Sequence, residues 1–261
     1  MCRFIAWHGE PILLEDLIAS PSHSLIRQSV HATESRSETN GDGFGIGWYG
    51  EHERPGIYRE VYPAWSDENL VSICAQVRSR LFFAHVRAAT GTATTRANCH
   101  PFAVGRHMFM HNGQIGGYHA IRRRLEDRIP DALYAARVGT TDTEVLFLTA
   151  LANGLGEDPV AAMEKTLGEI MVEMDRASIG APLRVTAALS DGATIWAFRW
   201  ASDQAPATLY YKPEKQGTIV VSEPIDERRE DWVPVPPNQV LIARHGEPAA
   251  LHSLNPAAPQ A

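Results

Sequence analysis

Hydrophobic residues recur along the chain with two different spacings, which divide it into a mixed first part, a helical middle and a final part rich in strands. Segments 11–19 and 67–81 show the spacing of a helix, and Ser66 is a suitable N-cap for the second one. Residues 31–43 are polar and rich in glycine, so we expect a long surface loop there. Strand-like patterns are found at residues 43–50, 81–89 and 106–113.

Helical patterns dominate the middle of the chain, over roughly 118–129, 141–153 and 159–176. The last of these has Asp158 as a suitable N-cap and Pro159 in its first turn. Asp191 and Gly192 stand between two later strand-like segments and predict a tight hairpin. The strand-like segments of this final part are residues 183–190, 193–200, 208–212, 217–223 and 239–244. This order favours an α+β protein whose helices pack against antiparallel sheet.

Length and composition are those of an ordinary globular protein. The 261 residues are 44% hydrophobic and 21% charged, and no linker or repeat interrupts them, so we expect one domain over residues 2–254 and a short tail over 255–261. The net charge of −7, without a long basic run, argues against nucleic acid or an anionic membrane and favours a small-molecule ligand. Because no segment has the apolar length of a signal peptide core or a membrane span, we expect a cytoplasmic location.

The cysteines are odd in number and far apart, which fits neither a disulfide framework nor a zinc-thiolate site. Cys74 lies on the apolar stripe of segment 67–81, so we expect a buried core thiol. Cys2 directly follows Met1, and once Met1 is removed the α-amine of Cys2, with a reference pKa of about 8, can act as base for the thiol. The alternative is an inert thiol in an ordinary N-terminal strand.

The stretch MHNGQI contains a candidate oxyanion hole. The side-chain amide of Asn112 and the backbone N–H of Gly113 are two donors that can converge on one developing negative oxygen. An Asn-Gly pair is also typical of a plain hairpin turn, and the local sequence favours that alternative.

Two charged residues are candidates for binding a zwitterionic substrate. Arg87 lies inside an apolar strand pattern and needs a partner, which is either a substrate carboxylate or an internal acidic side chain. Asp142 stands at the start of a helical pattern, where helix capping is the ordinary role and binding of a substrate ammonium is the functional alternative.

The eleven histidines raise the question of a metal site. His107 and His111 are four residues apart, but that segment has a strand pattern and no HExxH motif is present, so we expect no metal. Cys99 and His100 form a competing nucleophile and base. Adjacent residues of an extended segment point to opposite faces, which disfavours a direct dyad.

Five motifs follow one another along the chain: Cys2 behind Met1, then HVRAAT, NCHPF, HNGQI and TTDTE. In this order they resemble a class II glutamine amidotransferase domain of the N-terminal-nucleophile hydrolase superfamily. The resemblance covers nearly the whole chain and includes the late stretch VVSEPID. Three further stretches are similar to stand-alone members of this family: MCRFIAW, SLIRQS and NGDGFGIGWY. These members are the YafJ-type proteins and the γ-glutamyl hydrolases of ergothioneine biosynthesis and glutathione breakdown. The resemblance implies a four-layer αββα sandwich, and we expect no cofactor.

The resemblance also implies a catalytic set. Cys2 is the expected nucleophile, and Asn112 with Gly113 is the expected oxyanion hole. We therefore expect hydrolysis of a γ-glutamyl amide bond, in glutamine or another γ-glutamyl compound. The reaction passes through a γ-glutamyl thioester on Cys2 and releases glutamate and ammonia or an amine.

Substrate-binding roles follow from the same resemblance. Arg87 is expected to hold the substrate α-carboxylate, Asp142 its α-ammonium, and His100 helps to shape the glutamyl pocket. Ala88 stands where many synthase-linked members carry an aromatic residue, so we expect the pocket to close over glutamine differently.

Two other functions compete with this hypothesis. The chain is either a glutaminase subunit that supplies ammonia to a separate synthase partner, or a binding module that captures γ-glutamyl compounds without turnover. The identity of the γ-glutamyl substrate stays open at this point, as does the choice between a homo-oligomer and another oligomeric state.

Overall fold

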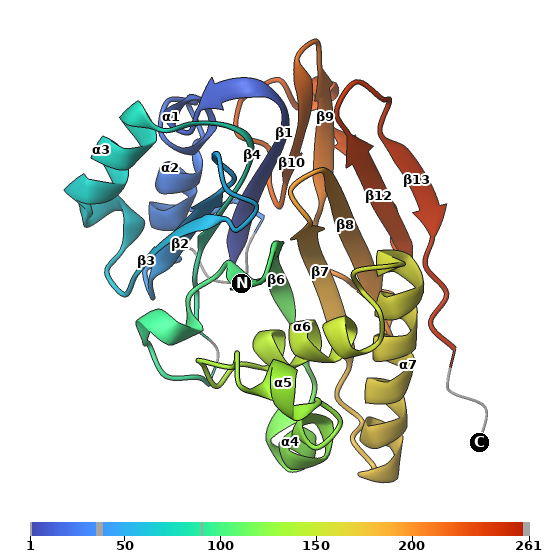
Figure 1. The fold of residues 1–261 in the computed structure, drawn as a ribbon. Coiled ribbons are helices and arrows are strands. Elements are labelled where there is room, and N and C mark those ends of the chain that lie inside the picture. The colour runs from blue at the N-terminus through green and yellow to red at the C-terminus, as the bar shows by residue number, and fades with distance from the viewer. Residues whose placement is uncertain (1, 35–38, 90, 258–261) are drawn as a thin grey trace.

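The computed structural model describes residues 2–34, 39–89 and 91–257, and within them the strands build two sheets (Figure 1). The strands of the first sheet are β1 (Arg3–Leu13), β2 (Phe44–Trp48), β3 (Gly56–Glu60), β4 (Arg78–Val86), β9 (Tyr210–Glu214), β10 (Gly217–Val221) and β11 (Val233–Pro234). Their order across the sheet is β11-β9-β10-β1-β4-β2-β3, and neighbouring strands are antiparallel. The first strand therefore lies in the centre of this sheet, beside a strand from the last fifth of the chain.

The second sheet contains β5 (Phe102–Val104), β6 (His107–Ile115), β7 (Leu183–Ser190), β8 (Thr194–Ala201), β12 (Gln239–Arg244) and β13 (Ala250–Ser253). Its order is β13-β12-β8-β7-β6-β5, again with antiparallel neighbours. The two sheets face each other through an apolar layer to which both contribute.

Helices cover the two outer faces (Figure 1). On the first sheet lie α1 (Glu15–Ile18), α2 (Leu25–Val30) and α3 (Glu68–Gln76), with one shared core of buried side chains. On the second sheet lie α4 (Tyr118–Glu126), α5 (Asp131–Tyr134), α6 (Asp142–Ala152) and α7 (Pro159–Arg176), with another. Three short 3-10 turns complete the described elements: η1 (Ala64–Ser66), η2 (Arg96–Asn98) and η3 (Arg229–Asp231). The result is the four-layer αββα arrangement expected from the sequence.

Alternation along the central strands assigns each side chain to one of the layers. In β1, Phe4 and Ala6 pack between the two sheets, whereas Ile5 and Trp7 pack under α1–α3. In β6, Met108 and Met110 face the first sheet, and Phe109 faces the helices. This alternation decides which functional side chains can meet in the space between the sheets.

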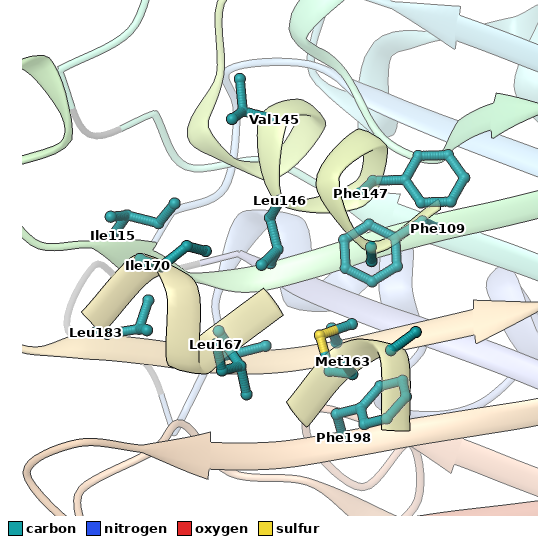
Figure 2. Close-up of a cluster of buried hydrophobic side chains, with 14 of the residues drawn as sticks. Phe109, Ile115, Val145, Leu146, Phe147, Met163, Leu167, Ile170, Leu183 and Phe198 are labelled. Carbon is teal, nitrogen blue, oxygen red and sulfur yellow. The ribbon is translucent and has the colours of Figure 1, made fainter. Parts of the chain in front are cut away.

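The layer under α6 and α7 fixes the position of α6 over β6 (Figure 2). Phe109 of β6 stacks on Phe147 of α6, with ring centroids 5.2 Å apart and an interplanar angle of 9°. Met163 and Leu167 of α7 belong to the same cluster and are fully buried. Each such apolar side chain contributes about 1.5–3 kcal/mol by its burial. Because Asp142 is the first residue of α6, this packing also fixes where its carboxylate lies.

The helix predicted for residues 11–19 is only partly correct. β1 continues to Leu13, and after a register shift Ile12 pairs with Ser79 and Leu13 with Arg78. The helix begins at Glu15. Ile12 and Leu13 pair with β4, and this long-range contact outweighs the local helical spacing.

The prediction for residues 67–81 needs two corrections. The N-cap is Asp67, whose carboxylate accepts from Leu70 N at 2.7 Å, whereas Ser66 belongs to the preceding 3-10 turn. The helix ends at Gln76, and residues 78–81 open β4 instead. The helical spacing continues past Val77, but pairing in the sheet determines the structure there. The expectation that Cys74 is buried is confirmed.

Other local predictions are confirmed. α7 spans residues 159–176, and the Asp158 carboxylate accepts from Val160 N and Ala161 N, both at 3.1 Å. The hairpin between β7 and β8 has Gly192 at a φ of 90°, a backbone conformation that favours glycine. The described parts of the loop at 31–43 contain no helix or strand, and residues 35–38 lie outside the described residues. No helix in the described ranges is long and apolar enough to cross a membrane.

Candidate active site

Cys2 directly precedes β1 of the first sheet, and Asn112 lies in β6 of the second sheet. Cys2 lies two residues before Phe4, whose side chain packs between the sheets, and strand alternation gives Cys2 the same direction. Asn112 lies two residues after Met110 on β6 and by the same rule also points into the space between the sheets. The candidate nucleophile and the candidate oxyanion donor therefore face the same interior space from two sides.

The Cys2 thiol is partly buried, and its Sγ lies 3.7 Å from the carbonyl oxygen of Ala88. Burial raises the pKa of this thiol above its ordinary value, although the backbone contact with Ala88 and the positive charge of Arg87 act in the opposite direction. At neutral pH the group is therefore a thiol, and it needs a base before it can attack a carbonyl carbon.

The backbone around Cys2 is held by a buried ion pair that sequence reasoning missed. Arg3 is fully buried, its Nη1 donates to the Cys2 carbonyl at 3.2 Å, and its Nε lies 3.1 Å from Glu223 Oε2. The Glu223 carboxylate also accepts from His23 Nε2 at 2.6 Å and from the backbone N–H groups of Thr33 and Glu34, both at 2.9 Å. The late motif VVSEPID contains Glu223, but the local sequence gives no sign that it pairs with Arg3.

Hydrogen bonds keep Glu223 ionised in spite of its burial. Burial alone raises the pKa of a carboxyl group, but the donors from His23, Thr33 and Glu34 outweigh it and bring the pKa of Glu223 down to about 2. The network therefore connects the Cys2 carbonyl, through Arg3, to the backbone of residues 33 and 34.

Asn112 and Gly113 lie inside β6, opposite Thr186 and Val185 of β7, so the hairpin-turn alternative is wrong. Asn112 is 2% exposed, and its Nδ2 has no hydrogen-bond partner among the described residues. At Gly113, an added Cβ would overlap the Arg184 carbonyl oxygen and His111 Nε2. Glycine is therefore required at this position for β6 and β7 to come so close.

Arg87 is buried, and its guanidinium binds neutral oxygens. Nη2 donates to Thr92 Oγ1 at 2.6 Å and to the Ala93 carbonyl at 3.3 Å, and Nη1 donates to the Asp42 carbonyl at 3.4 Å. The Asp42 carboxylate instead accepts from Ala89 N at 2.8 Å. Within the described part of the chain no acidic side chain pairs with Arg87, so its positive charge is available to an anionic ligand.

Asp142 is the first residue of α6 and joins this helix to β6. Its Oδ2 accepts from Ile115 N and its Oδ1 from Thr143 N, both at 2.8 Å. The N-cap is Thr141, whose hydroxyl accepts from Glu144 N at 3.3 Å. The segment therefore does contain the helix cap, but the capping residue is Thr141 and not Asp142.

Asn98, a second residue whose role the sequence does not reveal, connects the segment after Arg87 with the segment that precedes Asp142. Its Nδ2 donates to the Ala93 carbonyl at 2.9 Å, the same oxygen that Arg87 contacts. Its Oδ1 accepts from Thr140 N at 2.8 Å, two residues before Asp142. Asn98 opens the motif NCHPF, and its burial is the property that a single sequence does not reveal.

His100 lies in a cluster of buried histidines. Its Nδ1 is 2.9 Å from His85 Nε2, and its ring centroid is 5.0 Å from that of Phe102. Burial lowers the pKa of His85 to about 3 and keeps that of His100 well below its ordinary value, so both rings are neutral at pH 7. Cys99 Sγ contacts the carbonyls of Glu60 and Thr95 and not His100, which agrees with the expected absence of a direct dyad.

His111 supports the helix that begins with Asp142. Its Nε2 donates to the Arg184 carbonyl at 3.2 Å, which leaves Nδ1 to accept from the Thr143 hydroxyl at 3.0 Å. His111 points to α6 rather than to a site shared with His107, and no group of three potential ligands is placed to hold a metal ion within residues 2–34, 39–89 and 91–257.

A cleft of about 200 Å³ opens directly beside the oxyanion candidates. Asn112 and Gly113 form part of its wall, together with Glu34, Arg184 and residues 205–208. The structure thus connects the segment after Arg87 with the start of α6, where Asp142 lies, through Asn98, and it places Asn112 with Gly113 at the edge of this cleft. Such an arrangement offers an amide side chain and a glycine backbone at the wall of a cleft that can hold a ligand.

Known proteins resemble the chain over most of its length. Residues 15–213 match the family model described as glutamine amidotransferases class-II. The boundaries of the proposed domain, 2–254, extend further on both sides and stay a prediction.

Two curated relatives are similar over 94% of this chain. A probable glutamine amidotransferase of Saccharomyces cerevisiae, DUG3, is 33% identical, and the match covers 82% of it. The gamma-glutamyl-hercynylcysteine sulfoxide hydrolase of Mycolicibacterium smegmatis is 27% identical, and the match covers 96% of it.

A solved structure is similar as well, that of a glutamine aminotransferase class-II domain protein from Silicibacter pomeroyi. It is 39% identical with a TM-score of 0.77, and the match covers 98% of this chain and all of the other. The αββα sandwich is thus of the N-terminal-nucleophile hydrolase type, as expected. On these grounds the chain belongs to the class II glutamine amidotransferase family.

Proposed function

We propose that the protein hydrolyses a γ-glutamyl amide bond through a γ-glutamyl thioester on Cys2. The observation that carries the proposal is the orphan amide of Asn112, which is buried at the edge of the cleft without a partner among the described residues. A buried donor left without a partner costs about 1–3 kcal/mol. An oxyanion that forms during the reaction gives this donor its partner.

The proposed reaction begins with the thiol. With Met1 removed, the α-amine of Cys2 accepts the Sγ proton, and Sγ attacks the γ-carbonyl carbon. Asn112 Nδ2 and the Gly113 N–H stabilise the tetrahedral oxyanion. The α-amine then returns the proton to the departing nitrogen as the C–N bond breaks, and water hydrolyses the thioester to release glutamate. The raised pKa of Cys2 supports the need for this base.

The glutamyl part of the substrate is assigned to Arg87 and Asp142 rather than to the cleft beside Asn112. Arg87 binds the α-carboxylate, which its buried and acid-free surroundings favour. Asp142 binds the α-ammonium, and the packing of α6 on β6 holds its carboxylate in place. His100 contributes to the shape of the pocket through its neutral ring beside His85.

Trapping of the intermediate tests this proposal. Processed protein is mixed with L-glutamine or a γ-glutamyl amide and quenched in acid, and mass spectrometry of the N-terminal peptide follows. We expect a γ-glutamyl adduct on Cys2 and glutamate in solution. Cys74→Ser is the matched control, because that thiol of α3 is buried in the core between the helices and the first sheet and should not affect the adduct. Glutamate release without any adduct on Cys2 would contradict the thioester route.

The two alternative functions predict different results. A synthase partner that receives ammonia would raise glutaminase activity on mixing. A binding module would retain γ-glutamyl compounds without releasing glutamate.

The cytoplasmic location rests on the composition of the chain alone and is tested by fractionation of the cells that make it.

A further inference from the structure

The segment that follows β4 lies between Cys2 and a glycine-rich turn. β4 stands between β1 and β2 in the sheet, and its last residue, Val86, pairs with the start of β1 on one side and with Phe44 of β2 on the other. Both neighbours are antiparallel to β4, so the residues that precede β1 and β2 flank the chain just beyond Val86. Cys2 and the turn at residues 40–43 therefore approach residues 87–89 from opposite sides.

Asp42 continues the pairing of β2 with β4 past the ends of both strands. Arg87 N donates to the Gly43 carbonyl at 2.9 Å, and Asp42 N donates to the Arg87 carbonyl at 3.0 Å. The next donor of this pairing, Ala89 N, is bound by the Asp42 carboxylate at 2.8 Å instead of by a backbone carbonyl. The side chain of Asp42 thus replaces one hydrogen bond of the sheet at a point where the backbone no longer supplies it.

Two glycines give Asp42 its position. Gly43 has a φ of 107°, which favours glycine, and an added Cβ would lie 2.6 Å from Cys99 Sγ. Gly41 lies against the ring of Trp65, which would be 2.9 Å from an added Cβ. The motif NGDG belongs to the resemblance, but the proposed reaction makes no use of it. These contacts show that it forms a tightly packed turn around one carboxylate.

The peptide group between Ala88 and Ala89 connects Asp42 to the nucleophile. Asp42 Oδ2 accepts from its N–H, and the Cys2 thiol contacts its carbonyl oxygen, which belongs to Ala88, at 3.7 Å. Among the described residues these are the two hydrogen bonds of this peptide. A thiol is a weak donor, so its contact does not hold the peptide in place. Because the N–H and the C=O of one peptide share a plane, Asp42 sets the direction of the Ala88 carbonyl.

We propose that Asp42 is a positioning residue for the nucleophile. By holding the peptide between Ala88 and Ala89, it keeps the Ala88 carbonyl beside Cys2 and so fixes the position of Sγ. The same turn reaches the expected carboxylate-binding residue, because the Asp42 carbonyl accepts from Arg87 Nη1 at 3.4 Å. This inference rests on the proposed function and adds the residue that aligns the attacking atom. Asp42 takes up no proton and forms no bond with the substrate; it needs only an acceptor oxygen.

Two substitutions at Asp42 separate the acceptor from the space that the side chain fills. Asp42→Asn keeps an oxygen that can accept from Ala89 N, whereas Asp42→Leu has a similar shape and no acceptor. Values of kcat and KM are measured by glutamate release from L-glutamine or glutathione, whichever the original protein turns over faster. A small displacement of a reacting atom can cost about 10²-fold in rate, so kcat should fall roughly 10²-fold in Asp42→Leu and stay within about 5-fold in Asp42→Asn.

Asp191→Leu is the matched control for a general loss of stability. Its carboxylate accepts from Ala193 N and Thr194 N, both at 2.9 Å, in the hairpin between β7 and β8. This hairpin is remote from the oxyanion candidates, because Ser190 pairs with Met108 at the other end of β6. Urea denaturation should show a loss of stability in the control, while its kcat stays within about 2-fold of the original because no reacting atom moves. If Asp42→Leu does not fold, Asp42→Ala takes its place.

Alkylation of the thiol gives a readout that needs no substrate. Iodoacetamide is added to the processed protein, and mass spectrometry of the N-terminal peptide follows the modification of Cys2. The thiol is partly buried, and a released Ala88 carbonyl exposes it further. We therefore expect Cys2 to react at least about 3-fold faster in Asp42→Leu, and within about 2-fold of the original rate in Asp42→Asn and Asp191→Leu.

The outcomes separate this inference from the proposed function. An unchanged kcat or an unchanged alkylation rate in Asp42→Leu would overturn the role of Asp42, while the hydrolase proposal stands. Asp42→Asn as slow as Asp42→Leu would overturn it too, because the charge and not the acceptor would then be required. If the original protein releases no glutamate, the proposed function fails, and the alkylation rates alone decide whether Asp42 positions the thiol.

Discussion

Glu223 and Glu34 are neighbouring acidic residues whose hydrogen-bonding environments are opposite. Glu223 is completely buried and surrounded by donors from His23, Thr33 and Glu34, with Arg3 as its ionic partner. Glu34 is less buried, yet one of its carboxylate oxygens is without a partner in the described residues. A satisfied buried charge stabilises structure, whereas an unsatisfied polar atom at a cleft indicates a place for a ligand. We therefore interpret the two regions as a support and a binding surface.

The strongest test of the support is to remove one partner of the buried pair. Glu223→Gln leaves Arg3 charged and without its partner, and we expect the free energy of unfolding to fall by about 3–5 kcal/mol, measured by urea denaturation. Glu157→Gln, an exposed position in the turn before α7, is the control and should change stability little. A loss below about 1 kcal/mol for Glu223→Gln would mean that the pair is not a structural support.

The second test applies to the other region, where we expect activity and stability to separate. Asn112→Ala removes a donor that has no partner in the described chain, so the free energy of unfolding should change by less than about 1–2 kcal/mol. Turnover should fall by about 10²–10³, the usual effect of losing one oxyanion donor. Steady-state glutamate release and urea denaturation on the same sample check both. Near-normal turnover would exclude Asn112 from the oxyanion hole.

Acid stability offers a smaller and different test, because the buried histidines avoid the cost of burial by staying neutral. The folded state holds the pKa of His85 at about 3, against 6.5 in the unfolded chain. Stability from this group is therefore complete above about pH 6.5 and is lost as pH falls toward 3, at about 1.4 kcal/mol per pH unit.

His85→Gln isolates this effect. Between pH 7.5 and 5.0 the original protein should lose about 2 kcal/mol more unfolding free energy than the variant. This window lies above the range from 4.5 to about 2 in which Glu223 titrates, so the two contributions separate. Parallel stability curves for the two proteins would show that His85 takes up a proton in the folded state.

The sequence predicts elements whose signals are local and fails where distant segments decide. α7 has its cap, its first-turn proline and its apolar stripe within twenty residues, and its bounds are correct. Segment 67–81 has an equally good helical stripe, but its last residues pair with β1, which no local pattern reveals. The short strands β3, β5, β11 and β13 and the short helices α2 and α5 carry too little local signal to be expected.

The candidate site follows the same rule. Motif residues such as Cys2, Arg87 and Asn112 can be identified from the order of short patterns along the chain. Their partners cannot, because Arg3 and Glu223 are 220 positions apart and meet only through the neighbouring strands β1 and β10. Glu34 and residues 205–208 come together in the cleft from similarly distant parts of the chain.

The central claim is that Cys2 reacts with the help of its own α-amine, and one measurement tests it directly. A cleavable peptide is fused ahead of Cys2, and glutamate release from a γ-glutamyl amide is followed before and after cleavage that leaves Cys2 at the N-terminus. The account predicts no activity with the peptide attached and full activity after its removal. Full activity with the peptide still attached would contradict it.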